Sequence, residues 1–161
     1  MRIGLISDTH GILRPAVFDL FQDVDHILHA GDVGSPDILI DLQTIAPVTA
    51  VWGNTDGFDI RACTTEQAEV ELGGVRFALA HGHRVAEFDR LADIFPRAGA
   101  IVHGHSHVPR DDLVNGIRML NPGSAGPGGA GWPPSVAIVD IEDSSIILVH
   151  LDVATRSPLL T

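Results

Sequence analysis

The first third of the chain repeats one pattern, in which an apolar run of strand length leads into a polar loop. The three apolar runs are residues 3–7, 26–30 and 47–52. Pro15 favours a helix that extends to about Phe21, and Ser35 favours a second helix that extends to about Thr44. Strands that alternate with helices in this way predict a largely parallel sheet.

The rest of the chain favours hairpins and one further helix. Two-residue sequences typical of tight hairpin turns lie at 73–74 and 115–116, and apolar residues at helical spacing predict a helix over 87–97. The remaining strands are expected at 69–72, 75–80, 100–102, 112–114, 117–119, 136–141 and 146–153. The glycine- and proline-rich stretch 121–134 is predicted to be an irregular loop. Because no linker divides the chain, we expect a single domain over residues 1–161.

Composition and charge exclude several classes of protein. The chain has 161 residues, enough for one domain, and no apolar stretch is long enough to span a bilayer. A net charge of -11, without lysine and with scattered arginines, offers no basic surface for a large nucleic acid. The N-terminal apolar run is too short for a secretory signal, so we expect a cytoplasmic protein. Because Cys63 is the only cysteine, an intramolecular disulfide and a cysteine-bound metal cluster are excluded.

Polar side chains that can bind metal follow the ends of several predicted strands. Seven of them are Asp8, His10, Asp32, Asn54, His81, His105 and His107. The carboxyl ends of parallel strands meet at one edge of an open α/β sheet, so we expect these side chains to converge on one cleft. Asp8 and His10, like His105 and His107, are two residues apart, and extended backbone would place each pair on one side. Together with His83 and His103, six of the nine histidines fall in three such loops, which argues against ordinary turn residues.

The mixture of donors predicts the kind of metal. Imidazole, carboxylate and amide oxygen together suit borderline divalent ions, so we expect manganese, with iron, nickel or zinc as alternatives. Seven ligands are too many for one tetrahedral ion, which predicts two ions roughly 3.5–4 Å apart with a shared ligand. Asp32 is favoured as that shared ligand because a carboxylate has two oxygens. Two bound cations would reverse the local charge, so the acidic composition permits a small anionic substrate.

The order of these motifs resembles that of the calcineurin-like metallophosphoesterase superfamily. The matching blocks are Asp8-Thr9-His10, Gly31-Asp32, Gly53-Asn54, His81 and Gly104-His105-Ser106-His107. The small size of the chain and the blocks 7–11, 29–32 and 121–124 narrow the resemblance to the small YfcE-like phosphodiesterases. The resemblance implies an α/β fold: a four-layer α-β-β-α sandwich with two mixed β-sheets, the metallo-dependent phosphatase fold.

The resemblance also implies a division of the ligands and a reaction. One metal ion would be held by Asp8, His10, Asp32 and His107, and the other by Asp32, Asn54, His81 and His105. The expected reaction is hydrolysis of a small phosphodiester, with Asp32, Asn54 and His81 among the catalytic residues. Binding between the ions would lower the pKa of a water molecule towards about 7, and the resulting hydroxide would attack phosphorus in line. Preference for a diester over a monoester rests on the resemblance alone, so a phosphomonoesterase remains an alternative.

Two positions depart from the family pattern. Many members of the superfamily have a histidine directly after the asparagine, where it can protonate the leaving oxygen, and this chain has Thr55. Small relatives commonly carry an arginine after the block at 121–124, whereas this chain has only small residues and proline at 125–130. The expected substrate contacts are therefore His83, His103 and Arg14. Further candidates are Arg84 and Arg110 as phosphate contacts, and His29 as a donor that orients a metal ligand.

Two other functions compete with hydrolysis of a phosphate ester. A non-catalytic scaffold of the same fold is the first, since the fold resembles that of a retromer subunit. Seven polar groups gathered at strand ends would be costly for a scaffold without metal. Another type of dinuclear hydrolase is the second, but the chain is too short for a barrel of about 250 residues. The loop around Trp132 is a candidate interface for a homo-oligomer.

Overall fold

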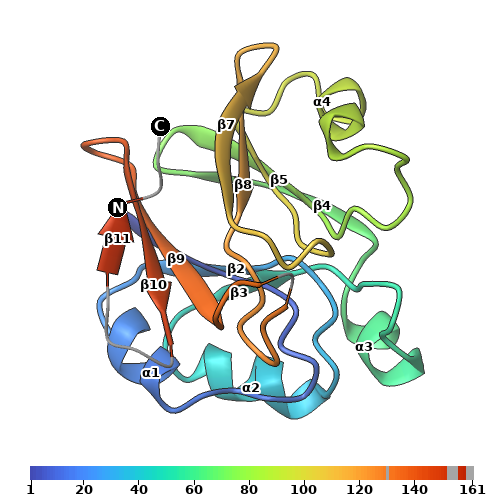
Figure 1. Ribbon diagram of the computed structural model, residues 1–161, viewed down its shortest axis with the longest axis vertical. Helices are drawn as coiled ribbons and strands as arrows, with labels where there is room; N and C mark the ends of the chain where they lie inside the picture. The colour runs from blue at the N-terminus through green and yellow to red at the C-terminus, as the bar shows by residue number, and fades with distance from the viewer. Residues whose placement is uncertain (130, 152–155, 159–161) are drawn as a thin grey trace.

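Two mixed β-sheets lie face to face, and helices cover their outer faces (Figure 1). The computed structural model describes residues 1–129, 131–151 and 156–158, the last three only in their backbone. Helices α1 (Ala16–Phe21) and α2 (Pro36–Gln43) pack on one sheet, and α4 (Leu91–Ile94) packs on the other. The expected four-layer α-β-β-α sandwich is therefore confirmed.

The first sheet has six strands in the order β11-β10-β9-β1-β2-β3. Their bounds are β1 Arg2–Ile6, β2 His26–His29, β3 Val48–Ala50, β9 Ser135–Asp140, β10 Ser145–His150 and β11 Arg156–Pro158. β1, β2 and β3 run parallel, as the repeated units predict, whereas β9 is antiparallel to β1. β10 begins one residue earlier than predicted, and the predicted residues 152–153 at its end lie outside the described residues.

The second sheet has five strands in the order β4-β5-β6-β8-β7. Their bounds are β4 Gln67–Leu72, β5 Val75–Ala80, β6 Ala100–Val102, β7 Arg110–Val114 and β8 Ile117–Asn121. Both predicted hairpins are present, β4 with β5 and β7 with β8, and β6 runs parallel to β5 and β8. Gly73 and Gly74 have φ angles of 57° and 81°, the positive pair that a tight two-residue hairpin turn requires.

The helices differ from the prediction in two places. The predicted helix over 87–97 is only the short η1 (Phe88–Arg90) followed by α4. It ends before Pro96 because a proline disfavours helical backbone at the preceding residue, and Phe95 has φ −118° and ψ 63°. α3 (Phe58–Cys63) was not predicted. None of the helices in the described ranges is long and apolar enough to cross a membrane.

Three apolar clusters fill the spaces between the four layers. Phe21, Ile27 and Leu42 belong to the cluster between the first sheet and its helices. A second cluster lies between the sheets, and a third lies under α4. Alternate residues of β5 point to opposite faces: Phe77 reaches the cluster between the sheets and Ala78 the cluster under α4. The packed sheets therefore hold their strand ends at fixed positions.

Several loops at the strand ends have left-handed backbone. Seven described residues other than glycine have a positive φ, and five of these belong to the predicted metal ligands. The five are Asp8 (53°), His10 (48°), Asp32 (52°), His105 (68°) and His107 (60°). The expected extended backbone of the pairs at 8–10 and 105–107 is therefore wrong. A side chain in this region is strained, and strain of this kind is concentrated at functional sites.

The left-handed backbone at His10 predicts an unusual order of stability between two variants. His10→Gly and His10→Ala both remove the imidazole, but only glycine adopts a φ of 48° without steric cost. We expect the metal-free glycine variant to be more stable by about 1 kcal/mol, or about 2–4 °C in Tm by calorimetry. The same two substitutions at His26, within β2, should give the opposite order. Equal Tm values for the two His10 variants would contradict the strain.

Candidate metal centre

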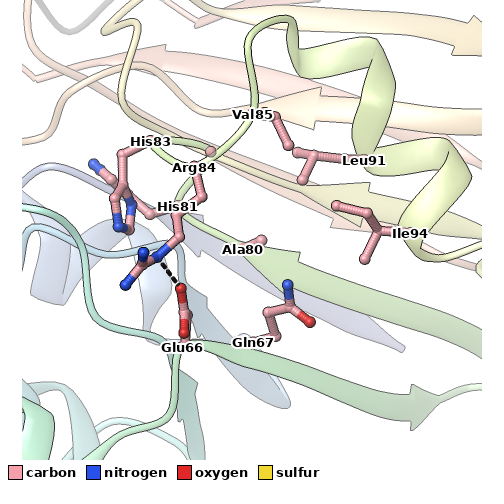
Figure 2. Close-up of a pocket in the computed structure, with 10 residues that line it drawn as sticks. Glu66, Gln67, Ala80, His81, His83, Arg84, Val85, Leu91 and Ile94 are labelled. Carbon is pink, nitrogen blue, oxygen red and sulfur yellow. Dashed lines mark ion pairs between the residues drawn. The ribbon is translucent and has the colours of Figure 1, made fainter.

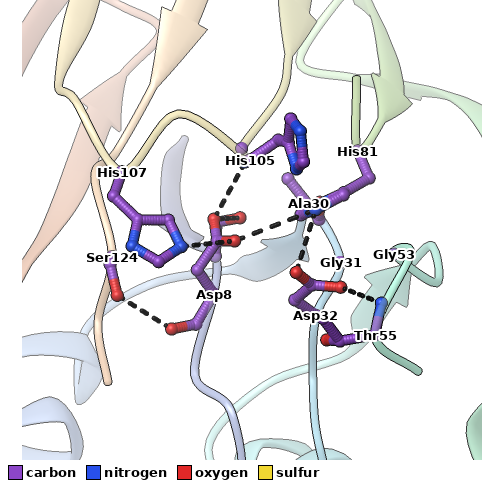
Figure 3. Close-up of polar contacts among 12 residues, drawn as sticks. Asp8, Ala30, Gly31, Asp32, Gly53, Thr55, His81, His105, His107 and Ser124 are labelled. Carbon is purple, nitrogen blue, oxygen red and sulfur yellow. Dashed lines mark hydrogen bonds and ion pairs between the residues drawn. The ribbon is translucent and has the colours of Figure 1, made fainter. Parts of the chain in front are cut away.

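Six of the seven predicted ligands come together at the carboxyl ends of four strands. Figure 3 labels all of these except His10. Their ligand atoms form two groups of three, and within each group all lie within 4.8 Å of one another. The first group is Asp8, His10 and His107, and the second is Asp32, His81 and His105. Both groups combine side chains from the two sheets. Asp8 and His10 follow β1 and Asp32 follows β2 in the first sheet, whereas His81 follows β5 and His105 and His107 follow β6 in the second.

The first group is arranged around the buried Asp8 carboxylate. His107 Nε2 lies 3.2 Å from Asp8 Oδ1, and His10 Nε2 lies 3.8 Å from the same oxygen. His107 Nδ1 lies 3.1 Å from the carbonyl oxygen of Gly128, which can only accept a hydrogen bond. The proton of the neutral imidazole is therefore on Nδ1, and the lone pair on Nε2 faces Asp8.

The second group repeats this arrangement around Asp32. His81 Nε2 lies 3.1 Å from Asp32 Oδ2, while His81 Nδ1 donates to the carbonyl oxygen of Ala30 at 2.8 Å. The backbone N–H of Thr55 donates to Asp32 Oδ1 at 2.9 Å and fixes the carboxylate. Asp32 Oδ2 is also 3.7 Å from His10 Nε2, so this carboxylate contacts both groups.

Both carboxylates are held in their ionised form. Burial alone would raise the pKa of Asp8, but its contacts with His10 and His107 outweigh burial and keep the pKa below its usual range. Burial would likewise raise the pKa of Asp32, but the contact with His81 outweighs it and lowers the pKa to about 2. At neutral pH the two groups therefore present two buried negative charges beside four imidazoles.

The residues fit a pair of divalent cations. Among the described residues, Asp8 Oδ1, His10 Nε2 and His81 Nε2 are buried and have no hydrogen-bond partner. An unpartnered buried polar atom is costly, and these three belong to the two groups of ligand atoms. Nitrogen and oxygen donors of this kind suit borderline divalent ions.

The loops that carry the aspartates are tied together by two buried side chains. Asp56 accepts hydrogen bonds from the backbone of Val33, Gly34 and Gly53 at 2.9–3.1 Å, which joins the loops after β2 and β3. The sequence analysis missed Asp56, and its position in a glycine-flanked turn was the only available signal. His29 was expected to donate a proton that orients a metal ligand, and its ring contacts Thr9, which lies between Asp8 and His10.

The His29 contacts determine its tautomer. Its Nδ1 accepts from the backbone N–H of Gly31 at 3.2 Å, so its Nε2 carries the proton and donates to Thr9 Oγ1 at 3.0 Å. Thr9 in turn donates to the carbonyl oxygen of Val33. Burial lowers the pKa of His29 to about 4, which keeps the ring neutral. This chain of hydrogen bonds fixes the loop between Asp8 and His10 against the end of β2.

The other predicted site residues lie around the two groups. The ring of His83 is 5.5 Å from that of His81, between centroids, and 6.4 Å from that of His105. Asn54 is exposed and directly precedes Thr55, which contacts Asp32.

His103, by contrast, is buried within the protein. It stacks on Phe88 at 4.5 Å between ring centroids, and burial lowers its pKa to about 4.

The three candidate arginines have protein partners. Arg14 donates to the carbonyl oxygen of Gly126 at 2.8 and 3.2 Å. Arg110 pairs with Asp89 and Asp112 at 2.6 and 2.7 Å. Arg84 pairs with Glu66, and the ion pair borders a small cavity of about 70 Å³ beside His81 (Figure 2). Such a cavity is too small for most organic ligands, which occupy about 300–1,000 Å³.

An aromatic and cationic cluster lies beside the second group. The Arg61 guanidinium is 4.2 Å from the centroid of the Trp52 ring, and that of Arg84 is 5.9 Å away. The Trp52 ring also lies 5.7 Å from that of His83, which in turn neighbours His81. Positive charge therefore lies close to the candidate metal centre in an otherwise acidic chain.

Comparisons with known proteins agree with this geometry. A probable metallophosphoesterase of Methanothermobacter thermautotrophicus is 40% identical, covering 94% of this chain and 87% of the relative. A phosphodiesterase of Methanocaldococcus jannaschii is 27% identical, covering 88% of this chain and 94% of the relative. The structure of Entamoeba histolytica Vps29 complexed with Zn²⁺ has a TM-score of 0.81 at 25% identity, covering 99% of this chain and 97% of the other.

A family model also matches most of the chain. The model for the calcineurin-like phosphoesterase superfamily domain matches residues 1–144, which include every strand end that carries a candidate ligand. The chain therefore belongs to the calcineurin-like phosphoesterase superfamily.

Proposed function

We propose that the chain is a phosphodiesterase that uses two divalent metal ions to hydrolyse small phosphodiesters. The observation that carries the proposal is the pair of adjoining ligand groups, in which buried donor atoms lack protein partners. One ion would be held by Asp8, His10, Asp32 and His107, and the other by Asp32, Asn54, His81 and His105. The contact of Asp32 with both groups supports its role as the shared ligand.

The protein's own groups prepare these ligands. The carbonyl oxygens of Ala30 and Gly128 hold the Nδ1 protons of His81 and His107, so each Nε2 lone pair is available. The N–H of Thr55 holds one oxygen of Asp32 and leaves the other facing the cleft. When bound, two such ions supply Lewis acids and an activated water.

The surroundings of the centre favour an anionic ester with a good leaving group. Arg61, which lies over Trp52 on the His83 side of the second group, supplies a positive charge that can attract a phosphate ester, whereas the charge of Arg84 is paired with Glu66. At the position where many members of the superfamily have a proton-donating histidine, this chain has Thr55, which hydrogen-bonds Asp32 and whose hydroxyl has no useful acidity. We therefore expect faster hydrolysis of nitrophenyl esters than of alkyl esters.

Manganese is the proposed metal, with iron, nickel or zinc as alternatives, because the donors mix imidazole and carboxylate. A non-catalytic scaffold is the second candidate function, and the structural likeness to Vps29 favours it. Since that Vps29 structure contains Zn²⁺, metal binding alone does not distinguish the two functions, and turnover does.

Removal of one ligand from the second group should strongly reduce turnover. We expect His81→Ala to lose at least about 100-fold in kcat/KM for bis(p-nitrophenyl) phosphate, because several kcal/mol of charge stabilisation are lost. The release of nitrophenolate, measured with each metal in turn, checks this. His26→Ala is the matched control, since His26 hydrogen-bonds Thr49 at the opposite end of β2. Equal rates for wild type and His81→Ala would exclude the proposed site.

The same assay separates the candidate reactions. Wild type should hydrolyse bis(p-nitrophenyl) phosphate faster than p-nitrophenyl phosphate. The reverse order would favour a phosphomonoesterase. A protein that binds metal but hydrolyses neither ester would favour the scaffold.

Metal binding should also stabilise the fold, by an amount that depends on which metal is bound. Mn²⁺ at about 100 times its Kd should add about 2.7 kcal/mol, which raises the Tm by about 5–10 °C. Ca²⁺ at the same concentration should raise it less, because calcium prefers oxygen ligands and four of the six clustered side chains are histidines. Differential scanning fluorimetry measures both shifts. Equal shifts with the two metals would contradict a centre with imidazole ligands.

A further inference from the structure

The segment that follows β8 contacts two loops that carry candidate ligands. It is the glycine- and proline-rich stretch beginning at Asn121. Its first four residues form one of the blocks that narrow the family resemblance, but the proposed reaction assigns them no role. The backbone N–H of Ala125 donates to the carbonyl oxygen of Ser7 at 2.9 Å, and that of Gly126 donates to the carbonyl oxygen of Asp8 at 3.2 Å. A Cβ added at Gly126 would overlap with the carbonyl oxygen of Thr9. The segment is therefore pressed against the loop that follows β1.

Asn121 holds the loop that follows β6. Its side chain is 1% exposed, and both its oxygen and its nitrogen have partners. The Nδ2 group donates to the carbonyl oxygen of Gly104 at 3.1 Å and to Ser106 Oγ at 3.0 Å. Oδ1 accepts from the N–H of Gly123 at 2.8 Å. Because Gly104 and Ser106 flank His105, this amide fixes the backbone that presents the histidines of both groups.

Ser124 connects the two ends of the first group. Its buried hydroxyl donates to the carbonyl oxygen of Asp8 at 3.0 Å, as Figure 3 shows, and accepts from the N–H of Gly128 at 3.2 Å. The carbonyl oxygen of Gly128 in turn accepts from His107 Nδ1 at 3.1 Å. Asp8 and His107 are thus joined behind the site through Ser124, while Asp8 Oδ1 and His107 Nε2 face each other within it.

We propose that Ser124 and Asn121 are positioning residues that set the spacing of the metal ligands, and that Ser124 acts selectively on the first group. This inference rests on the proposed function, since it assigns the ligands to two ions. Asp32 and His81 of the second group are held by other partners, Thr55 and Ala30. Loss of the Ser124 hydroxyl should therefore weaken the ion held by Asp8, His10 and His107 and spare the other.

The test is Mn²⁺ binding to the metal-free protein, measured by titration calorimetry. Ser124→Ala should weaken one of two binding steps by about 10- to 100-fold and change the other less than about twofold. Ser135→Ala is the matched control: Ser135 is equally buried, and its hydroxyl donates to the carbonyl oxygen of Pro122 in the same segment at 2.7 Å rather than to a loop that carries a ligand. The control should lose stability while keeping both affinities. Equal affinities for wild type and Ser124→Ala would overturn the inference.

A double-mutant cycle assigns the weakened step to a group. In a His10→Ala background the first group is already damaged, so Ser124→Ala should have little further effect on the remaining ion. Electron paramagnetic resonance provides an independent readout. When the Mn²⁺-loaded protein is diluted, the coupled signal of two Mn²⁺ ions should be replaced by that of a single ion. This change should occur at a higher protein concentration in Ser124→Ala than in wild type. A further loss of affinity at the remaining ion would overturn the selectivity.

A second variant keeps the inference testable if Ser124→Ala does not fold. Asn121→Asp preserves the size of the side chain but removes the two N–H donors that face Gly104 and Ser106. It should weaken both binding steps, because His105 and His107 belong to different groups. Unchanged affinities would overturn the role of Asn121. Wild-type protein that binds two ions without hydrolysing any ester would instead refute only the proposed function.

Discussion

The candidate centre depends on keeping two ionised carboxylates buried beside four imidazoles. A buried charge without compensation costs several kcal/mol, so the surrounding backbone has to supply partners. Asp8 Oδ2 accepts from Ser7 Oγ at 2.6 Å and from the N–H of His105 at 3.2 Å, and Thr55 serves Asp32 in the same way. One oxygen of each carboxylate is thereby satisfied, and the other remains directed at histidine nitrogens. Because one oxygen of each carboxylate is left facing histidine nitrogens, the arrangement favours a bound cation between them over a purely structural pair of aspartate and histidine.

Local sequence patterns were sufficient to predict most of the fold. Apolar runs of strand length identified β1, β2 and β3, and the glycine-containing pairs at 73–74 and 115–116 identified both hairpins. Because parallel strands share an edge, the positions of Asp8 and Asp32 after β1 and β2 also predicted that these residues lie close together, whereas His81 reaches Asp32 from β5 of the second sheet. The strand and hairpin predictions share one property: each depends on residues within a few positions of one another.

The features that sequence analysis missed depend on contacts between distant segments. Asp56 was missed, and Asn121 and Ser124 were noticed only as part of a family motif, because all three donate to or accept from backbone groups that have no side-chain signature in the partner segment. The left-handed residues could not be foreseen either, because aspartate and histidine adopt that region more often than most residues but still in only a small minority of cases, unlike glycine. His103 belongs to the same loop as His105, yet stacking on Phe88 holds it inside the protein. Proximity to a motif in the sequence is therefore weaker evidence for a role in the site than the direction in which the side chain points.

Each ligand group takes side chains from both sheets, and this has a mechanical consequence. Apart from hydrogen bonds such as that of His81 Nδ1 to the carbonyl oxygen of Ala30, the sheets adhere through the apolar cluster between them, which includes Leu5, Phe77 and Leu79. A cation at the centre would act as a removable cross-link at one edge of that interface, closing a chain loop between residues 8 and 107. The sheets could then separate only after the cross-link opens, so occupancy would govern the rate of unfolding as well as the equilibrium.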